Sequence, residues 1–271
     1  MKCITIKPLY NGKASLDIYL RDKAYEFVDH SKRPFVLVLP GGGYSMLAPH
    51  EGEPVAMAFL QAGYQVGVLS YSVRSDDAAP FLGNTPLQEA AAAIRTVRSN
   101  AAQWGIDPDK ISVCGFSAGG HLAGSIGVFG SDPERIDGAE DGTAQPNAMI
   151  LCYPVIYGKL QQKDSIYNLT GMDIPSPQRD AWSLHLHVTE KTCPAFIWTT
   201  ANDDIVNAQN SLQMAASLQK AGVNCEMHMY GSGHHGMSLA NDEAGTANKH
   251  ISTWFSLVLQ WLNSVGVGTG Y

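Results

Sequence analysis

The fold of this chain is decided by the stretch Ile111-Ser112-Val113-Cys114-Gly115-Phe116-Ser117-Ala118-Gly119. Its first half is an apolar run typical of a buried strand. Its second half is a Gly-x-Ser-x-Gly motif that opens a helix expected over residues 118–128. A serine at such a turn projects its hydroxyl from a strained backbone, and the flanking glycines avoid collisions with the strand and the helix. Ser117 is therefore a candidate nucleophile, and the alternative is a tight turn that merely contains a serine.

Seven further segments have the composition of strands. Continuous apolar runs indicate strands that are covered on both faces, as in a parallel sheet, whereas the first two segments are partly polar and suit an antiparallel edge. Helical patterns separate most of the strands, so the sequence predicts an α/β fold with an eight-stranded, mostly parallel sheet and helices on both faces. The seven segments are Ile4–Leu9, Ser15–Leu20, Phe35–Leu39, Gln65–Val73, Ala148–Ile156, Ala195–Thr200 and Cys225–Tyr230.

Three more helices are expected besides the one that follows Ser117. The first begins with Thr85 as its N-cap and Pro86 at its first position, and one apolar stripe continues to Trp104. The second covers about residues 208–218, and the third covers residues 251–262. The aromatic side chains of the last helix are more typical of a core than of a ligand cage.

The composition excludes several protein classes. The chain has 271 residues, of which 45% are hydrophobic and 16% are charged, and its net charge is -7. These values exclude a disordered chain, a coiled coil and a collagen. The acidic balance argues against nucleic acid as a partner, because phosphate binding needs a basic surface.

The N-terminal residues and the cysteines suggest a reducing compartment. No secretory signal and no membrane span are expected from the sequence. The five cysteines are odd in number and include no Cys-x-x-Cys pair, so reduced thiols are expected rather than disulfides or a metal site. We therefore expect a cytoplasmic protein. Asn168 begins a glycosylation sequon that would mean little in that compartment.

A glycine-rich loop, Pro40-Gly41-Gly42-Gly43-Tyr44, directly follows the most apolar strand. Adjacent glycines let several backbone N–H groups point at one atom. The loop is not a nucleotide-binding P-loop, because no Gly-Lys-Ser or Gly-Lys-Thr follows it. It is instead a candidate oxyanion-binding loop, and the alternative is a flexible turn.

A serine nucleophile needs a base and an acid, and both candidates follow later strands. The acid is Asp203 or Asp204 after Ala195–Thr200, and the base is His234 or His235 after the last strand. Ligand sites in open α/β sheets lie at the carboxyl ends of the strands, where these residues are expected. The spacing leaves the choice within each pair open.

Two other patterns are weaker. Residues 231–236 also match Gly-x-Gly-x-x-Gly, but no βαβ unit follows, so a dinucleotide site is not expected. His121, His185 and His187 have no supporting carboxylate cluster, and we interpret them as structural or surface residues. No metal and no cofactor are expected.

The motifs together resemble the α/β-hydrolase superfamily, and more narrowly the bacterial esterase/lipase group of acetyl xylan esterase-like (sugar-ester) hydrolases. The resemblance implies an α/β-hydrolase fold and covers about residues 35–240. It rests on Leu39–Tyr44, Asp107–Ile111, Gly115–Ala123, Thr200–Val206 and Gly233–Met237.

The resemblance also assigns roles to residues. The family pattern places the acid three residues before a valine, which selects Asp203, and places the base in Gly-x-His-Gly, which selects His235. The chain departs from the pattern at Pro40 and Asn202, and neither departure removes a catalytic atom. The implied oxyanion donors are the N–H groups of Gly42, Gly43 and Ala118.

The expected function is hydrolysis of short-acyl, acetyl-type carboxylic esters, acetylated sugars among them, through a Ser-His-Asp triad and an acyl-enzyme. The alternatives are an amidase or peptidase with the same triad, and a non-catalytic binding protein. Tyr44, Tyr157 and Trp182 are candidate substrate-binding residues, with ordinary core aromatics as the alternative. The partner is a small-molecule ester, and a homodimer is left open.

The candidate site draws on residues from 42 to 235, so we expect a single domain over residues 1–271. Within it, the long mixed segment 157–192 is expected to be a small lid or substrate-binding insertion.

Overall fold

A computed structural model describes residues 1–10, 13–22, 32–160, 165–173 and 176–270. Eight strands form one sheet in the order β1-β2-β4-β3-β5-β6-β7-β8. Their bounds are β1 (Lys2–Leu9), β2 (Ala14–Leu20), β3 (Arg33–Leu39), β4 (Gln65–Ser70), β5 (Ile106–Phe116), β6 (Ala148–Cys152), β7 (Ala195–Thr200) and β8 (Cys225–Tyr230). The predicted eight-stranded α/β sheet is thereby confirmed.

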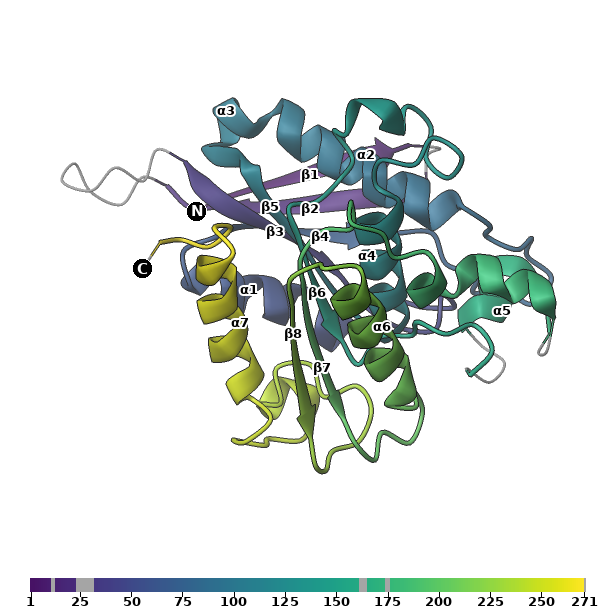
Figure 1. Cartoon of the computed structure of the whole chain (residues 1–271). Coiled ribbons are helices and arrows are strands. Elements are labelled where there is room, and N and C mark those ends of the chain that lie inside the picture. The colour runs from purple at the N-terminus through teal and green to yellow at the C-terminus, as the bar shows by residue number, and fades with distance from the viewer. Residues whose placement is uncertain (11–12, 23–31, 161–164, 174–175, 271) are drawn as a thin grey trace.

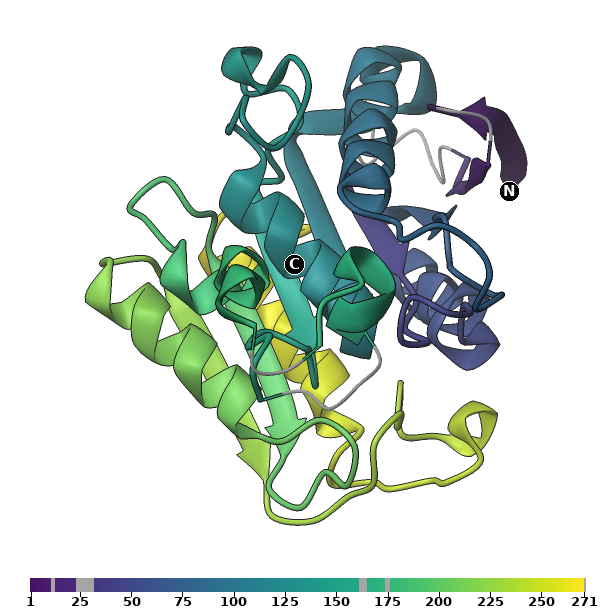
Figure 2. The ribbon, with the colours of Figure 1, turned by 90° about the vertical axis from the view of Figure 1, so that its right-hand side faces the viewer.

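The sheet is parallel except at β2. This strand pairs in antiparallel fashion with both β1 and β4, while every pair from β4 to β8 is parallel. The N-terminal strands lie at one edge of the sheet and β8 at the other (Figure 2). The carboxyl ends of β3, β5, β7 and β8 therefore meet at the same edge, where the candidate site residues follow them.

Helices cover both faces of the sheet, as predicted. Figure 1 shows α1 and α7 on one side and α2, α4 and α6 on the other. The helices are α1 (Glu53–Gln61), α2 (Thr85–Ser99), α3 (Ala101–Trp104), α4 (Ser117–Phe129), α5 (Ser165–Thr170), α6 (Gln209–Lys220) and α7 (Thr253–Ser264).

Strand alternation divides the core into two clusters. Leu37 and Leu39 of β3 belong to the cluster under α2, α4 and α6, whereas Val36 and Val38 belong to the cluster with α1 and α7. All four side chains are fully buried. A strand covered on both faces reads as a continuous apolar run, which explains the pattern in the sequence.

Several boundaries differ from the prediction. β4 ends at Ser70 and β6 at Cys152, although apolar residues follow both. α2 has Asn84 as its N-cap, so the assignment of Thr85 to that position was wrong by one residue. The apolar stripe toward Trp104 is shared by two helices, because α2 ends before α3 begins.

The described part of segment 157–192 contains α5 and the 3-10 helices η3 (Pro177–Trp182) and η4 (Leu184–Leu186). Leu184 packs on α4, and its N–H donates to the carbonyl of Ile156. Residues 161–164 and 174–175 of the expected lid lie outside the described residues. Lid behaviour and the single-domain assignment stay predictions.

All five cysteines are free thiols, as expected. Within the described ranges, no helix is both long and apolar enough to cross a membrane.

Candidate active site

Ser117 lies at the junction of β5 and α4 with a backbone φ of +52°. This left-handed conformation is strained for a residue with a side chain. A Cβ on Gly115 would approach the carbonyl oxygen of Gly119 to 2.1 Å, and a Cβ on Gly119 would approach that of Leu39 to 2.1 Å. Both glycines are thus required by close contacts between β5, α4 and the end of β3.

Ser117, His235 and Asp203 form a hydrogen-bonded series. The Ser117 Oγ lies 2.8 Å from His235 Nε2, and the Asp203 Oδ2 lies 2.8 Å from His235 Nδ1. A carboxylate can only accept, so Nδ1 carries the ring proton and Nε2 is free to accept from the serine hydroxyl. The side chain of Asp203 is 1% exposed and that of His235 is 11% exposed, so the series is shielded from water.

The neighbours that the spacing left open have other partners. The Asp204 Oδ1 accepts a hydrogen bond from the main-chain N–H of His235 (3.2 Å), not from its ring. The His234 Nδ1 lies 2.6 Å from the carbonyl oxygen of His235. The second oxygen of Asp203 accepts from the N–H groups of Ile205 and Val206, and these bonds fix its orientation.

The glycine-rich loop after β3 packs directly on the serine. A Cβ on Gly41 would lie 3.0 Å from the Cβ of Ser117. Gly42 and Gly43 have φ values of +121° and +66°, which glycine adopts at low cost. Within the described residues, no acceptor is found for the N–H groups of Gly42 and Gly43. The N–H of Ala118, in the first turn of α4, has no acceptor within its own helix.

The three candidate substrate-binding aromatics lie in different environments. Tyr44 is 1% exposed and its ring packs edge-on against Tyr71, so the structure supports the core alternative for this residue. Tyr157 is half-buried with its ring centroid 4.7 Å from that of His185. Trp182 is half-buried beneath the guanidinium of Arg135.

His121 connects α4 to the glycine-rich loop and to the insertion. Its Nε2 lies 3.0 Å from the carbonyl oxygen of Trp182, and its Nδ1 lies 3.0 Å from the hydroxyl of Tyr44. A carbonyl only accepts, so Nε2 carries the proton and Nδ1 accepts from Tyr44. Burial lowers the pKa of His121 to about 4. His121 is thus a neutral structural residue near pH 7, as predicted.

Asn168 was missed as a site residue by sequence reasoning. It lies on α5, is 9% exposed, and its Nδ2 donates to the carbonyl oxygen of Gly43 (2.9 Å). Its Oδ1 accepts from the buried guanidinium of Arg74 (3.3 Å). The sequon at this residue was the one signal in the sequence, and it pointed to glycosylation, which a buried amide does not suit.

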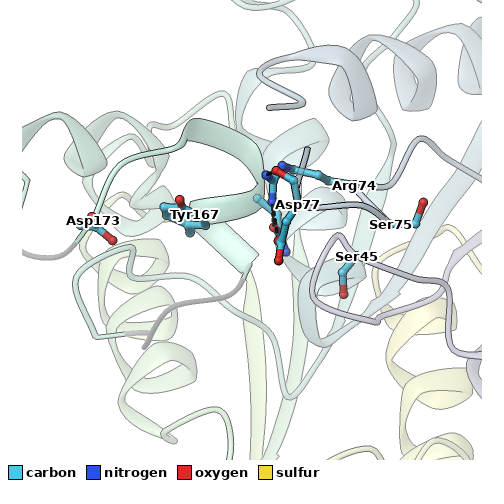
Figure 3. A pocket seen from close by; sticks show the side chains of 7 residues that line it. Ser45, Arg74, Ser75, Asp77, Tyr167 and Asp173 are labelled. Atoms are coloured by element: carbon cyan, nitrogen blue, oxygen red, sulfur yellow. Dashed lines mark hydrogen bonds and ion pairs between the residues drawn. The ribbon is translucent and has the colours of Figure 1, made fainter. Parts of the chain in front are cut away.

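A cavity of about 610 Å³ borders this contact. Figure 3 shows Tyr167 and Asp173 on one side of it and Ser45 and Ser75 on the other. Hydroxyl, amide and charged groups dominate the lining. The described residues that line it are Ser45, Arg74, Ser75, Asp77, Tyr167, Asn168 and Asp173.

Comparisons with known proteins agree with this arrangement. The BD-FAE family model matches residues 16–218. Endo-1,4-beta-xylanase B of Butyrivibrio fibrisolvens is 36% identical over 236 residues, which are 86% of this chain and 37% of that protein. Acetylxylan esterase of Xylanibacter ruminicola is 29% identical over an alignment of 272 residues that covers 98% of this chain and 50% of that protein. The chain therefore spans half or less of the length of these curated relatives.

A solved structure is similar over nearly its whole length. The acetyl ester-xyloside bifunctional hydrolase from Caldicellulosiruptor lactoaceticus superimposes with a TM-score of 0.79 at 35% identity, covering 94% of this chain and 89% of that one. The resemblance to acetyl xylan esterase-like hydrolases is confirmed by these similarities. Because the family model matches residues 16–218 and the sheet architecture is shared with the solved structure, the chain belongs to the BD-FAE family and has the α/β-hydrolase fold.

Proposed function

We propose that the chain is a serine carboxylic ester hydrolase that removes acetyl-type acyl groups from sugars. The observation that carries this proposal is the series Ser117–His235–Asp203, with 2.8 Å at each step. Two further observations support it: the N–H groups of Gly42 and Gly43 have no acceptor among the described residues, and the family relatives are named as esterases and hydrolases.

The first half-reaction forms an acyl-enzyme. The Nε2 of His235 accepts the Ser117 proton while Oγ attacks the ester carbonyl carbon, and Asp203 stabilises the resulting imidazolium. The N–H groups of Gly42, Gly43 and Ala118 bind the oxyanion of the tetrahedral intermediate. The intermediate then collapses, the ester C–O bond breaks, and Nε2 returns the proton to the leaving alcohol.

The second half-reaction uses water. His235 accepts a proton from a water molecule that attacks the acyl carbon. The second tetrahedral intermediate releases the acid and restores the Ser117 hydroxyl with the proton from Nε2. The acyl group passes from the ester to Ser117 and then to water, and His235 carries the proton in each half-reaction.

The alcohol part of the ester is assigned to the polar cavity. Sugars carry many hydroxyls that both donate and accept, and the Ser45, Ser75 and Asp173 side chains offer matching groups. Its volume is within the range of small-molecule sites. Asn168 supports this placement because it lines the cavity and contacts the carbonyl of Gly43.

The test of the activity is hydrolysis of 4-nitrophenyl acetate and of acetylated xylo-oligosaccharides by the purified chain. Ser117→Ala is expected to abolish turnover. The matched control is Ser125→Ala, which removes another buried hydroxyl from α4 and should leave turnover intact. Activity that survives Ser117→Ala would contradict the mechanism. Faster cleavage of aminoacyl 4-nitroanilides than of esters would favour the amidase alternative, and no turnover or fluorophosphonate labelling would favour the binding alternative.

The cavity is tested by filling it. Ser75→Trp should raise KM for acetylated xylo-oligosaccharides about tenfold, a loss of about 1.4 kcal/mol, with little change for 4-nitrophenyl acetate. Ser256→Trp on α7, an exposed serine on the opposite face of the sheet, is the matched control. An equal change for both substrates, or for both variants, would exclude the cavity as the alcohol site.

A further inference from the structure

Glu51 is a buried carboxylate next to the site. It ends the 3-10 helix η1 (Pro49–Glu51) and is 2% exposed. Its Oε2 accepts from the N–H of Gly41 (2.8 Å), and its Oε1 accepts from the hydroxyl of Tyr153 (2.6 Å). Burial raises the pKa of Glu51, and the two accepted hydrogen bonds oppose that effect. Carboxylates are rarely this buried unless they are paired, so the position calls for an explanation.

The Gly41 contact acts on the oxyanion loop. Gly41 precedes Gly42, and a Cβ on Gly41 would lie 2.6 Å from Glu51 Oε2 and 3.0 Å from the Cβ of Ser117. A side chain at position 41 would therefore collide with both the carboxylate and the serine, so only glycine fits there. Glu51 binds the N–H of Gly41, and in the described structure no acceptor is found for the N–H groups of Gly42 and Gly43, which follow it in the loop.

The Tyr153 contact acts on the loop that carries the histidine. The hydroxyl of Tyr153 also accepts from the N–H of Ser238 (2.8 Å), and its ring lies 4.9 Å from that of His235. Ser238 in turn donates from Oγ to the carbonyl oxygen of His50 (2.7 Å). The Nε2 of His50 lies 3.0 Å from the carbonyl oxygen of Gly236. His50 thus binds the loop just after His235 directly, and Glu51 is joined to the same loop through Tyr153.

We propose that Glu51 is a positioning residue that holds the oxyanion loop and the His235 loop in a fixed relation to Ser117. The inference rests on the proposed function. A carboxylate is suited to the position because both oxygens accept: one accepts from Gly41 of the oxyanion loop, and the other accepts from Tyr153, whose hydroxyl binds Ser238 of the His235 loop. A glutamine has a single acceptor oxygen. If that oxygen accepts from Gly41, the NH₂ group can only donate to the Tyr153 hydroxyl, whose own buried proton then loses its acceptor and whose bond to Ser238 is disturbed.

The chain offers a matched control in Glu89. This residue on α2 is fully buried, and its carboxylate likewise accepts from a backbone N–H and a hydroxyl, both of Ser72. It contacts neither the oxyanion loop nor the His235 loop in the described structure. Glu51→Gln and Glu89→Gln therefore remove the same kind of buried acceptor from different surroundings.

The experiment compares both variants with the wild type in three measurements: kcat and KM for 4-nitrophenyl acetate, the inhibition constant of an acetyl-type trifluoromethyl ketone, and the urea midpoint of unfolding. The ketone forms a tetrahedral adduct with the serine and needs the oxyanion site. Glu51→Gln should lower kcat about 100-fold at nearly constant KM and weaken the inhibitor by a similar factor. Glu89→Gln should lower only the urea midpoint.

Equal kcat values for the two variants would overturn the inference while the wild-type activity still supports the proposed function. A wild type without Ser117-dependent turnover would overturn both. If Glu51→Gln does not fold, Tyr153→Phe takes its place, because it removes the hydroxyl that joins Glu51 to the His235 loop and leaves the bond between Glu51 and Gly41 in place. It should lower kcat at constant KM, and a kcat equal to that of the wild type would overturn the inference.

Discussion

The Oδ1 of Asp204 lies 3.2 Å from the main-chain nitrogen of His235, so Asp204 binds the backbone of the residue whose ring is bound by Asp203. The hydrogen bond from the His235 N–H is the main cause that lowers the pKa of Asp204. Both acids of the loop after β7 are therefore engaged with the same histidine. Because Asp203 and Asp204 are adjacent and both bind His235, spacing in the sequence alone could not decide which of them binds its ring.

Asparagine substitutions should separate the two roles. Asp203→Asn removes the acceptor that fixes the ring tautomer of His235, and we expect kcat for 4-nitrophenyl acetate to fall about 10⁴-fold. Asp204→Asn keeps an oxygen that can accept from the His235 N–H, so its cost should be at most about tenfold. Steady-state kinetics of the two variants decides the assignment. A larger loss for Asp204→Asn would make Asp204 the acid of the triad.

The arrangement of the sheet could be predicted because its strands carry local signals. Phe35–Leu39 is apolar at every position and becomes β3, which is buried on both faces. α1 was missed: although Pro54 marks its first turn and Val55 and Phe59 lie one turn apart on its buried side, the helix is only nine residues long. A short apolar helix gives a weak periodic signal.

The contacts around the site could not be predicted in the same way. Glu51 meets Tyr153 across 102 residues of sequence, and Asn168 meets Gly43 across 125. Such contacts depend on how loops pack at the end of the sheet, and no local pattern encodes them. Tyr44 shows the same difficulty, because its position beside the glycines does not distinguish a pocket wall from a core aromatic, whereas its burial in the structure does.

Backbone strain at Ser117 should be measurable as stability. Both Ser117→Ala and Ser117→Gly remove the hydroxyl, but alanine remains strained at φ +52°, whereas glycine does not. We expect the glycine variant to be more stable than the alanine variant by about 1 kcal/mol in urea unfolding. Ser125, within α4, is the control: there glycine should be less stable than alanine by about 1 kcal/mol. If glycine were less stable than alanine at position 117, as it is expected to be at position 125, backbone strain at Ser117 would be contradicted.

Asn168 should act on turnover through Gly43. Asn168→Asp replaces the NH₂ group that donates to the Gly43 carbonyl with an oxygen that repels it. Because Gly43 is a proposed oxyanion donor, kcat should fall by about tenfold or more at nearly constant KM. Asn100→Asp is the control, since its NH₂ group also donates to a main-chain carbonyl, that of Thr96, at the end of α2. Equal kcat losses in the two variants would show that the effect is not specific to the site.

His121 should make the stability of the fold depend on pH. Its pKa is about 4 in the folded chain against the usual 6.5, so between these values the unfolded chain binds a proton that the folded chain does not. The stability that the neutral form of His121 contributes to the folded chain is therefore fully present above pH 6.5 and is lost as the pH falls toward 4. By this linkage, the free energy of unfolding should drop by roughly 2 to 3 kcal/mol between pH 7 and pH 4.5 because of this residue alone.

The variant His121→Gln isolates that contribution. Its amide can donate to the Trp182 carbonyl and accept from the Tyr44 hydroxyl, as the neutral imidazole does, but it does not titrate. Urea unfolding of both proteins at pH 7 and pH 4.5 cancels the effect of all other groups that titrate in both. The wild type should lose roughly 2 to 3 kcal/mol more than the variant. If both lose the same amount, His121 is not the neutral, buried connection between α4, the oxyanion loop and the insertion that its hydrogen bonds indicate.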